Sequence, residues 1–306
     1  MVNERLESLT VTKTLRTEGD GLIMNEITTP ETIFNYGRIY PKMDNRLYFL
    51  DGDGNERIVS LDDTDGYLDA EVRHAVFSDS TTQTLTSVTV PWNMCFDTKE
   101  HEHGVTLGTT GTVTISNATP AVITWAAHGL YVDSCVVFTT DGALPSGLVA
   151  GTRYYIIAAG FGTDSFQVSA TPQGAAINTS DAGSGTHTAT NTSIMTVGQN
   201  GFYGFIFSTL CDCTSGNATT IDVWFRKNGV NVDRSNTRVQ MATANNVIVA
   251  IADVGLDLEN GDNIEMFWVG SSTNDRLLAI AADTNPTRPA TPSTILTVKK
   301  ISREIV

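Results

Sequence analysis

The side chains best suited to bind a metal ion are His101 and His103, which are two positions apart. Alternate side chains of a β-strand point to the same side, so both imidazoles would face one way. Imidazole is a common zinc and copper ligand, and Asp97 and Glu102 lie nearby in the sequence. Histidine pairs of this kind are more often solvated surface residues. We therefore expect no metal and keep the two histidines as weak candidates.

No motif of a catalytic nucleophile occurs in the sequence. The chain has neither a Gly-x-Ser-x-Gly elbow nor a glycine-rich phosphate loop followed by Lys and Ser or Thr. Its carboxylates are numerous, but the sequence singles out no pair for glycoside hydrolysis. We expect no enzyme activity and no cofactor. An enzyme that cuts polysaccharide remains an alternative.

The four cysteines are spaced unlike a disulfide framework or a paired Cys-x-x-Cys zinc site. They are Cys95, Cys135, Cys211 and Cys213. The simplest interpretation is a set of free thiols in a protein made in a reducing cytosol. Cys211 and Cys213 should place their sulfurs on one face of a strand, where a local redox or metal role is the alternative.

Composition and charge exclude several classes of function. The chain has 306 residues, of which 17% are charged, and a formal net charge of −15. This length allows two or three domains. An acidic protein is repelled by phosphate backbones, so we expect no nucleic-acid partner. No apolar run approaches 18 residues, so we expect no membrane span, and the polar N-terminus does not resemble a secretory signal.

Short runs rich in β-branched and aromatic residues dominate the last third of the chain. Turn-forming Asn, Gly, Asp and Ser residues separate them, which is typical of an antiparallel sandwich. Asn228-Gly229, between two such runs, is a strong hairpin signal. The predicted strands are 201–207, 220–227, 237–243, 247–254, 263–269 and 294–301.

The run Gly201-x-Tyr203-x-Phe205 resembles the Gly-x-Tyr-x-Phe signature of the tumour necrosis factor-like and complement globular-head jelly rolls. The Gly261-Asp262 turn before an alternating strand and the final apolar strand also fit that family. The resemblance implies an all-β, antiparallel jelly-roll sandwich that forms a homotrimer and has no catalytic residues.

Adjacent aromatic residues such as Trp224 and Phe225 should point to opposite faces of a strand. Apolar residues on both faces favour oligomerisation, because one face fills the sandwich and the other packs on a neighbouring copy. The residues expected in the core or at the trimer interface are Tyr203, Phe205, Trp224, Phe225, Phe267 and Trp268.

Residues 33–60 read as three short strands with tight turns. They resemble a segment found near the N-termini of bacteriophage fibre and other virion proteins, where this part usually anchors the molecule to the virion. The anchoring candidates are Phe34, Tyr36, Arg38, Tyr40, Tyr48 and Phe49. Residues 51–56 suggest a calcium loop, but their spacing does not fit an EF-hand, and a hairpin turn is the simpler interpretation.

Residues 109–190 are rich in Thr, Gly, Ala and Ser and nearly free of charge. Four short strands can be drawn through them. The segment resembles a small β module of phage virion proteins, with Trp125, His128, Tyr154 and Phe166 in matching order. We expect His128 to organise a turn by a hydrogen bond. The module would leave the jelly roll near Gly108 and return near Thr192.

These observations predict three parts: an extended N-terminal anchoring arm (1–69), a discontinuous jelly roll (70–108 and 191–306) and an inserted β module (109–190).

The resemblances indicate a structural protein of a tailed-bacteriophage virion, made in the host bacterial cytoplasm. We expect a homotrimeric head fibre or decoration (cement) knob, with capsid or tail proteins as partners and possible binding to a host glycan. The alternatives are a tail fibre that recognises the host, or a secreted bacterial adhesin or lectin.

Overall fold

The computed structural model describes residues 37–41, 47–51, 53–58, 73–214, 216 and 218–302. All regular structure in these residues is β-strand, and every strand pairing is antiparallel. None of the described residues forms a helix long and apolar enough to cross a membrane. The chain divides into two compact units, residues 1–71 and 72–306, and each is treated separately below.

The first unit contains a three-stranded antiparallel sheet. Its strands are β1 (Arg38–Pro41), β2 (Leu47–Leu50) and β3 (Glu56–Ile58), in the order β1-β2-β3. The Asp51 carboxylate closes the β2–β3 hairpin by accepting hydrogen bonds from the backbone N–H groups of Asp53 (3.0 Å) and Asn55 (2.8 Å). This local network confirms the hairpin-turn interpretation of residues 51–56.

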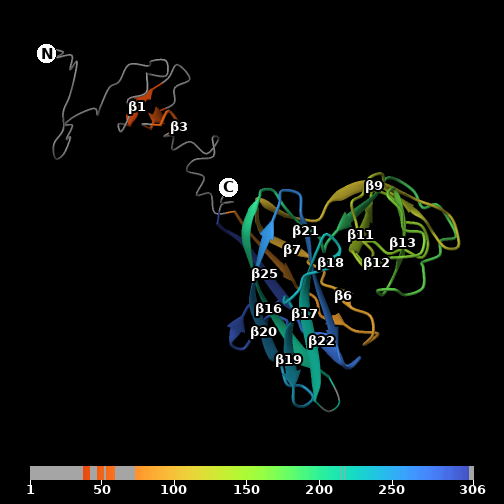
Figure 1. Ribbon diagram of the computed structural model, residues 1–306. Helices are drawn as coiled ribbons and strands as arrows, with labels where there is room; N and C mark the ends of the chain where they lie inside the picture. Colours follow the sequence, from red (N-terminus) through yellow and green to blue (C-terminus); the bar gives the residue numbers. More distant parts are fainter. Residues whose placement is uncertain are drawn as a thin grey trace. The chain divides into compact units, whose positions relative to one another are not determined.

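The second unit contains a sandwich of two seven-stranded sheets (Figure 1). The first, the β16 sheet, consists of β4 (His74–Asp79), β5 (Gln83–Thr84), β7 (Thr98–His103), β16 (Gly201–Cys213), β20 (Ile248–Leu258), β22 (Asp275–Leu277) and β25 (Thr294–Ser302). The second, the β21 sheet, consists of β6 (Trp92–Asn93), β8 (Val105–Leu107), β15 (Met195–Val197), β17 (Thr219–Lys227), β18 (Val230–Asn231), β19 (Thr237–Met241) and β21 (Asn263–Gly270).

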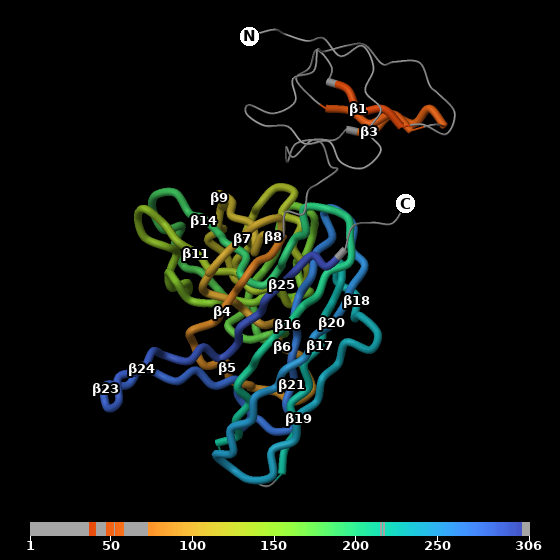
Figure 2. Tube along the Cα trace, turned by 90° about the vertical axis from the view of Figure 1, so that its left-hand side faces the viewer, coloured from red at the N-terminus to blue at the C-terminus, as the bar shows by residue number. Residues whose placement is uncertain are grey.

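The chain crosses repeatedly between these two sheets. After β16 it enters the other sheet for β17 to β19, returns for β20, crosses for β21 and returns for β22 and β25. This alternation is the connectivity of a jelly roll. The predicted all-β, antiparallel jelly-roll sandwich is confirmed. A small hairpin of β23 (Asp283–Thr284) and β24 (Thr287–Arg288) extends from the body (Figure 2).

Aromatic side chains fill the space between the sheets. Strand β16 points Tyr203, Phe205 and Phe207 inward, and all three are fully buried. The Phe225 ring from β17 lies 5.4 Å from Phe205 and 6.1 Å from Phe207, measured between centroids. Burying a side chain of this size contributes about 1.5–3 kcal/mol, so this aromatic row is a large part of the core.

The hairpin between β17 and β18 forms at the predicted Asn-Gly turn. Lys227 pairs with Val230 across it. Asn228 and Gly229 both have positive φ, at 50° and 80°. Two consecutive residues in this region are the requirement of a type I′ turn, which matches the twist of the strands that it joins.

A closed six-stranded barrel interrupts the sandwich between β8 and β15. Its strands are β9 (Thr110–Ile115), β10 (Ile123–Thr124), β11 (Cys135–Thr140), β12 (Arg153–Ile157), β13 (Ser165–Ser169) and β14 (His187–Asn191). Its own core includes Phe138, Ile156 and Phe166. Because β8 and β15 pair with each other, the chain leaves and re-enters the sandwich at adjacent points.

The barrel has six strands where four were predicted. The predicted module therefore contains more strands than the sequence indicated, and residues 146–147 form a turn. His128 meets its prediction: its Nδ1 accepts the Leu130 N–H (3.0 Å), and its Nε2 lies 2.8 Å from the Gly162 carbonyl oxygen.

A disulfide joins the barrel to the sandwich. Cys95 follows β6 and Cys135 begins β11, and docking brings their Cα atoms to 6.1 Å, within the range for a disulfide. The prediction of four free thiols is therefore wrong for this pair. It fails because the two cysteines belong to different parts of the fold, which sequence spacing does not show. Cys211 and Cys213 are buried and are not part of this disulfide.

We predict that the double change Cys95→Ser and Cys135→Ser lowers the free energy of unfolding. The disulfide spans 40 residues, and constraining a loop of this length in the unfolded chain is worth about 4 kcal/mol in the chain-entropy model. Urea denaturation of the oxidised protein and the variant measures the difference. Dithiothreitol should destabilise only the wild type. An equal stability of the oxidised and reduced wild-type protein contradicts the prediction.

Candidate interaction surfaces

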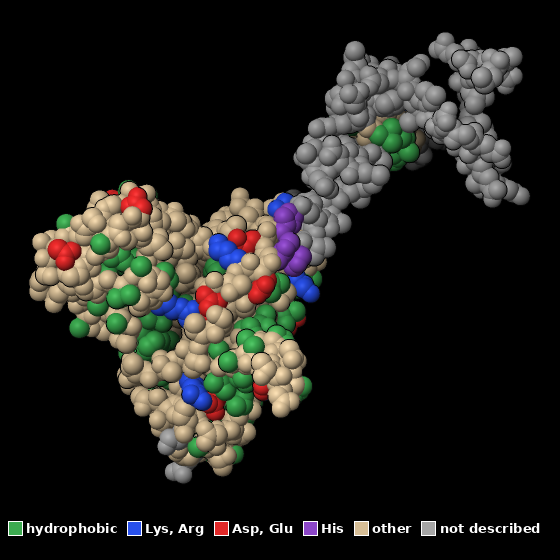
Figure 3. Space-filling view, turned by 180° about the vertical axis from the view of Figure 1, so that it is seen from behind, with side chains coloured by type: hydrophobic (Ala, Val, Ile, Leu, Met, Phe, Trp, Pro, Cys, Tyr) green, Lys and Arg blue, Asp and Glu red, His purple; other side chains and the backbone are tan. Residues whose placement is uncertain are grey.

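The two candidate metal ligands lie on an edge strand of the β16 sheet. In β7, His101 is paired with Val76 and His103 with His74, so both imidazoles lie on the outer face. The rings of His74 and His101 are stacked with centroids 4.2 Å apart. Figure 3 shows histidine side chains gathered on this side of the molecule. Among the described residues, no group of three or more His, Cys, Asp or Glu side chains could hold a metal ion.

Five of the six aromatic residues expected in the core or at a trimer interface are core residues. Tyr203, Phe205, Phe225, Phe267 and Trp268 are all fully buried within a single chain. Of the two alternatives given for these residues, core or interface, their burial agrees with the core. Trp224 is half-buried, and its Nε1 donates to Asn231 Oδ1 at 2.9 Å.

The apolar outer face of β21 is covered by other parts of the same chain. Trp268 points into the sandwich, whereas Phe267 points to the opposite side. The Phe267 ring stacks on Trp224, and the Arg226 guanidinium carbon lies 3.7 Å from its centroid. Arg226 also approaches Asp133 of the barrel segment at 4.0 Å. Phe267 is thus covered by side chains of the neighbouring strand β17, and Arg226 links this face to the insert.

A buried carboxylate lies at the centre of this contact between sandwich and insert. Glu265 Oε1 accepts hydrogen bonds from Asn93 Nδ2 (2.5 Å) and from Ser134 Oγ of the barrel segment (3.1 Å). Glu265 Oε2 and Asn93 Oδ1 have no hydrogen-bond partner among the described residues. Burial raises the pKa of Glu265 to about 7, and the two hydrogen bonds offset only part of this effect.

We predict that Glu265→Gln removes a pH-dependent loss of stability. The ordinary pKa is 4.5 and the folded value is about 7, so between these limits the folded state keeps a proton that the unfolded state has lost. Stability therefore falls as pH rises from 4.5 to 7, by on the order of 3 kcal/mol in total, and is level above pH 7. A glutamine side chain does not ionise, so the free energy of unfolding of the variant does not fall in this way between pH 4.5 and 7.

Urea denaturation at pH 5 and pH 8 measures both proteins. The variant should be more stable than the wild type at pH 8, with a smaller difference at pH 5. Glu259→Gln, at an exposed carboxylate in the turn before β21, serves as the control and should change neither value. A Glu265→Gln variant that is less stable at pH 8 contradicts the prediction.

The outer face of the β16 sheet carries apolar side chains that nothing in the described chain covers. Strand pairing places these residues on the face opposite to Phe205 and Phe207; Ser208, for example, lies between Ile251 and Ile295. We call this surface the apolar outer face. It comprises Ile206 (36% exposed), Val249 (47%), Ile251 (65%), Ile295 (38%) and Ile301 (59%).

Charged residues of opposite sign flank the apolar outer face. On one side, the edge strand β20 presents Asp253 and Asp257, which are both exposed. Toward the other side, β25 presents Lys299, which is paired with His74 of β4. Farther out, β7 carries Lys99 together with the exposed Glu100 and Glu102. The sheet therefore has an acidic edge at β20 and a flank of mixed charge at β25 and β7.

A signal for this surface is present in the sequence. Residues 247–252 form an unbroken apolar run, so every second residue of β20 is apolar on the side away from the core.

The anchoring candidates fall partly outside the described residues. Phe34 and Tyr36 lie outside them. Tyr40 and Tyr48 are buried against each other, with ring centroids 6.0 Å apart, so they form the small core of the β1–β3 sheet. Arg38 and Phe49 are half-buried.

No family model matches the sequence, and no curated protein matches it. Among solved structures, the chain is similar to one described as the structure of Eiger TNF from S. frugiperda. The identity is 10%, with 56% of this chain and 94% of that chain covered and a TM-score of 0.25. At this level the likeness carries no argument, and the jelly-roll assignment rests on the strand connectivity described above.

Proposed function

We propose that the protein is a homotrimeric surface protein of a tailed-bacteriophage virion. It acts as a head fibre or decoration knob and attaches through its N-terminal part, residues 1–69. The jelly roll forms the trimer, and the role is structural rather than catalytic. The apolar outer face of the β16 sheet is the observation that carries this proposal.

Contiguous exposed apolar surface is uncommon on monomeric proteins and marks interaction sites. The five residues of the apolar outer face lie on three adjacent strands, β20, β16 and β25. Burying them between copies removes apolar area from water, which is the dominant favourable term in association. The face is regular and lies on the rigid sandwich, so copies can meet there without rearrangement.

The flanking charges favour a ring of copies. In a head-to-tail contact, the acidic β20 edge of one copy, with Asp253 and Asp257, meets the side of the next copy that presents Lys299 on β25. Such contacts close into a ring when the rotation between copies allows it. Opposite charges at the rim also fix the register of the contact. This arrangement supports a cyclic trimer over a two-fold dimer, which would bring like charges together.

The assignment to a virion rests on the sequence resemblances of residues 33–60 and 109–190 to segments of phage structural proteins. The disulfide between Cys95 and Cys135 is compatible with this role, because a released virion is in oxidising surroundings where disulfides persist. Three copies per knob and many knobs per particle would convert weak individual contacts into stable attachment through multivalency.

We predict that Ile251→Asp converts the trimer to a monomer. Ile251 is 65% exposed in the single chain, so the change leaves the fold intact while placing a charge in the proposed contact. Light scattering should give three times the chain mass of 32.9 kDa for the wild type and one chain mass for the variant.

The matched control is Val230→Asp, at a residue that is 70% exposed on β18 of the other sheet. It should remain a trimer. A monomeric wild type at tens of micromolar, or a trimeric Ile251→Asp variant, contradicts the prediction.

We predict that antibodies against the protein label the capsid surface of phage particles. Immunogold electron microscopy of virions tests this directly. Labels on the capsid support the head fibre or decoration role, and labels confined to the tail support a tail fibre that recognises the host. Particles that lack the protein altogether contradict a virion role.

A further inference from the structure

A pocket of about 350 Å³ lies between the sandwich and the barrel. The sandwich contributes residues around β7 and β8, and the barrel contributes residues of β11, β12 and β14. Figure 3 shows a hollow between these two lobes with basic side chains at its edge. Small-molecule sites typically measure about 300–1,000 Å³ and occur at such junctions.

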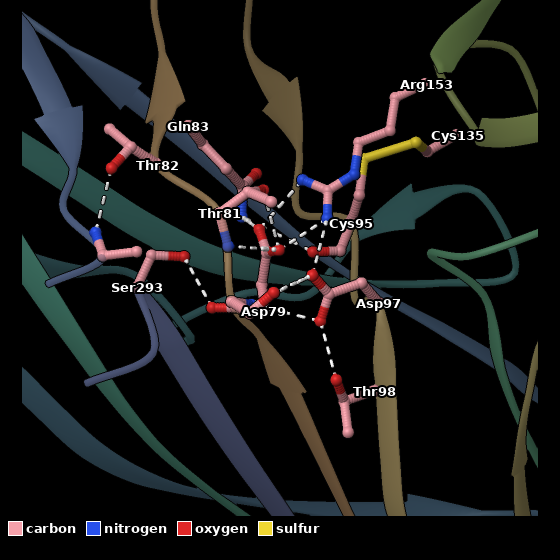
Figure 4. Close-up of polar contacts among 12 residues, drawn as sticks. Asp79, Thr81, Thr82, Gln83, Cys95, Asp97, Thr98, Cys135, Arg153 and Ser293 are labelled. Carbon is pink, nitrogen blue, oxygen red and sulfur yellow. Dashed lines mark hydrogen bonds and ion pairs between the residues drawn. A yellow bond between two sulfur atoms is a disulfide. The ribbon is translucent and has the colours of Figure 1, made fainter. Parts of the chain in front are cut away.

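The two cationic side chains of the pocket, Arg153 and Lys99, are held in fixed positions. Arg153 donates from both terminal nitrogens to Asp79 (2.9 and 2.5 Å) and lies 3.8 Å from Asp97 (Figure 4). Lys99 Nζ donates to the Leu107 carbonyl at 2.7 Å and lies 3.2 Å from Glu102. A guanidinium has five N–H donors and an ammonium three, so both groups keep donors for a ligand.

The Asp97 carboxylate is an ionised acceptor on the same wall. It accepts hydrogen bonds from the backbone N–H (3.1 Å) and the hydroxyl (2.5 Å) of Ser80 and from the Thr98 hydroxyl (2.8 Å), so only part of its acceptor capacity of about four sites is left for a ligand. Burial alone would raise the pKa of Asp97, but the hydrogen bonds from Ser80 and Thr98 and the nearby Arg153 charge outweigh it. The pKa is therefore below its ordinary value, and the group is a carboxylate at neutral pH.

Apolar and hydroxyl groups complete the lining. Val137 lies on the outward face of β11 and is half-buried, between the barrel-core residues Val136 and Phe138. Thr190 and Thr192 also border the pocket. Thr192 Oγ1 is buried and has no hydrogen-bond partner among the described residues, so a rotation about χ1 would offer this hydroxyl to a ligand.

The charged and hydrogen-bonding groups of the pocket determine which class of ligand can bind there. The two cations, Arg153 and Lys99, already face three carboxylates, those of Asp79, Asp97 and Glu102, so an added anion finds no net positive charge. A cation would meet the guanidinium and ammonium groups directly. A purely apolar ligand would leave the charged donors and acceptor without partners, which is costly. A neutral molecule with many hydroxyl groups fits, because each hydroxyl both donates and accepts.

We propose that this pocket binds a neutral saccharide unit. Asp97 accepts hydrogen bonds from sugar hydroxyls, Lys99 and Arg153 donate to them, and Val137 packs against the C–H groups of the ring. The proposal deepens the role in attachment and rests on the proposed function for its biological meaning: a knob on a virion would hold a host-surface glycan here.

The pocket is suited to binding rather than cleavage. Glycoside hydrolysis generally uses two carboxyl groups that flank the bond. Asp97 faces the pocket, whereas Asp79 is fully buried and occupied by Arg153, Thr81 and Gln83. Glu102 accepts a hydrogen bond from the Leu107 backbone N–H at 2.6 Å. One available carboxylate can orient a sugar but cannot supply both roles.

The test is saturation-transfer NMR with titration, on the purified full-length protein. The probes are glucose, galactose, mannose and N-acetylglucosamine, with glucuronic and N-acetylneuraminic acids as charged comparisons. We expect saturable binding of at least one neutral sugar. Val137→Trp fills the pocket from the outside of the barrel and should weaken binding at least tenfold. Thr139→Trp, at the next outward and exposed position of β11, is the matched control and should stay within twofold.

Asp97→Asn provides a second variant, which should weaken binding about tenfold even if Val137→Trp fails to fold. The proposal is overturned if no neutral sugar binds saturably, if only the acidic sugars bind, or if the folded variants bind within twofold of the wild type. Binding is measured on purified protein and does not depend on trimerisation or on attachment to a particle. Its failure is therefore distinguishable from a failure of the proposed function.

Discussion

The pairing of β8 with β15 is the constraint on which the second unit depends. Leu107 pairs with Met195 and Val105 with Val197, so two strands separated by the whole barrel are neighbours in the β21 sheet. Backbone hydrogen bonds continue beyond the pair, from Gly108 N–H to the Ile194 carbonyl at 2.6 Å. This pairing holds the two ends of the insert together, which lets the barrel close on itself while the sandwich keeps an unbroken sheet.

Polar contacts fix the barrel against the sandwich in one orientation. Glu265 reaches Ser134, and Arg153 reaches Asp79, each across the junction. Buried polar groups of this kind are costly to leave unpaired, so a shift of the barrel by a residue would be penalised at several points. The disulfide adds a covalent limit to the same motion. The pocket between the two lobes is consequently formed in advance, with its charged side chains already oriented.

The strands of the jelly roll could be predicted from the sequence because they are long and bounded by turn residues. Asn228-Gly229 and the Gly201–Phe207 run gave both the positions and the antiparallel class. Strands β9 and β14 could not, since β14 has a single small apolar residue, Ala189, and β9 has only Val113 and Ile115, and closure of the barrel supplies their stability. The residues that join the sandwich to the barrel could not be predicted from the sequence either. Asp79, Arg153 and Glu265 are distant in sequence, and only docking of the barrel gives them partners.

The adjacent ends of the insert make the barrel a removable module. A short turn from Leu107 to Met195 would convert β8 and β15 into an ordinary hairpin, with no change in their backbone pairing. Exchange of one module for another is therefore topologically simple and leaves the strand pairing of the sandwich unchanged. The outer face of β21 sets the limit, because any replacement must supply a hydrogen-bond donor to Glu265 in the place of Ser134. Glu265 and the residue that meets it would therefore change together when one module replaces another.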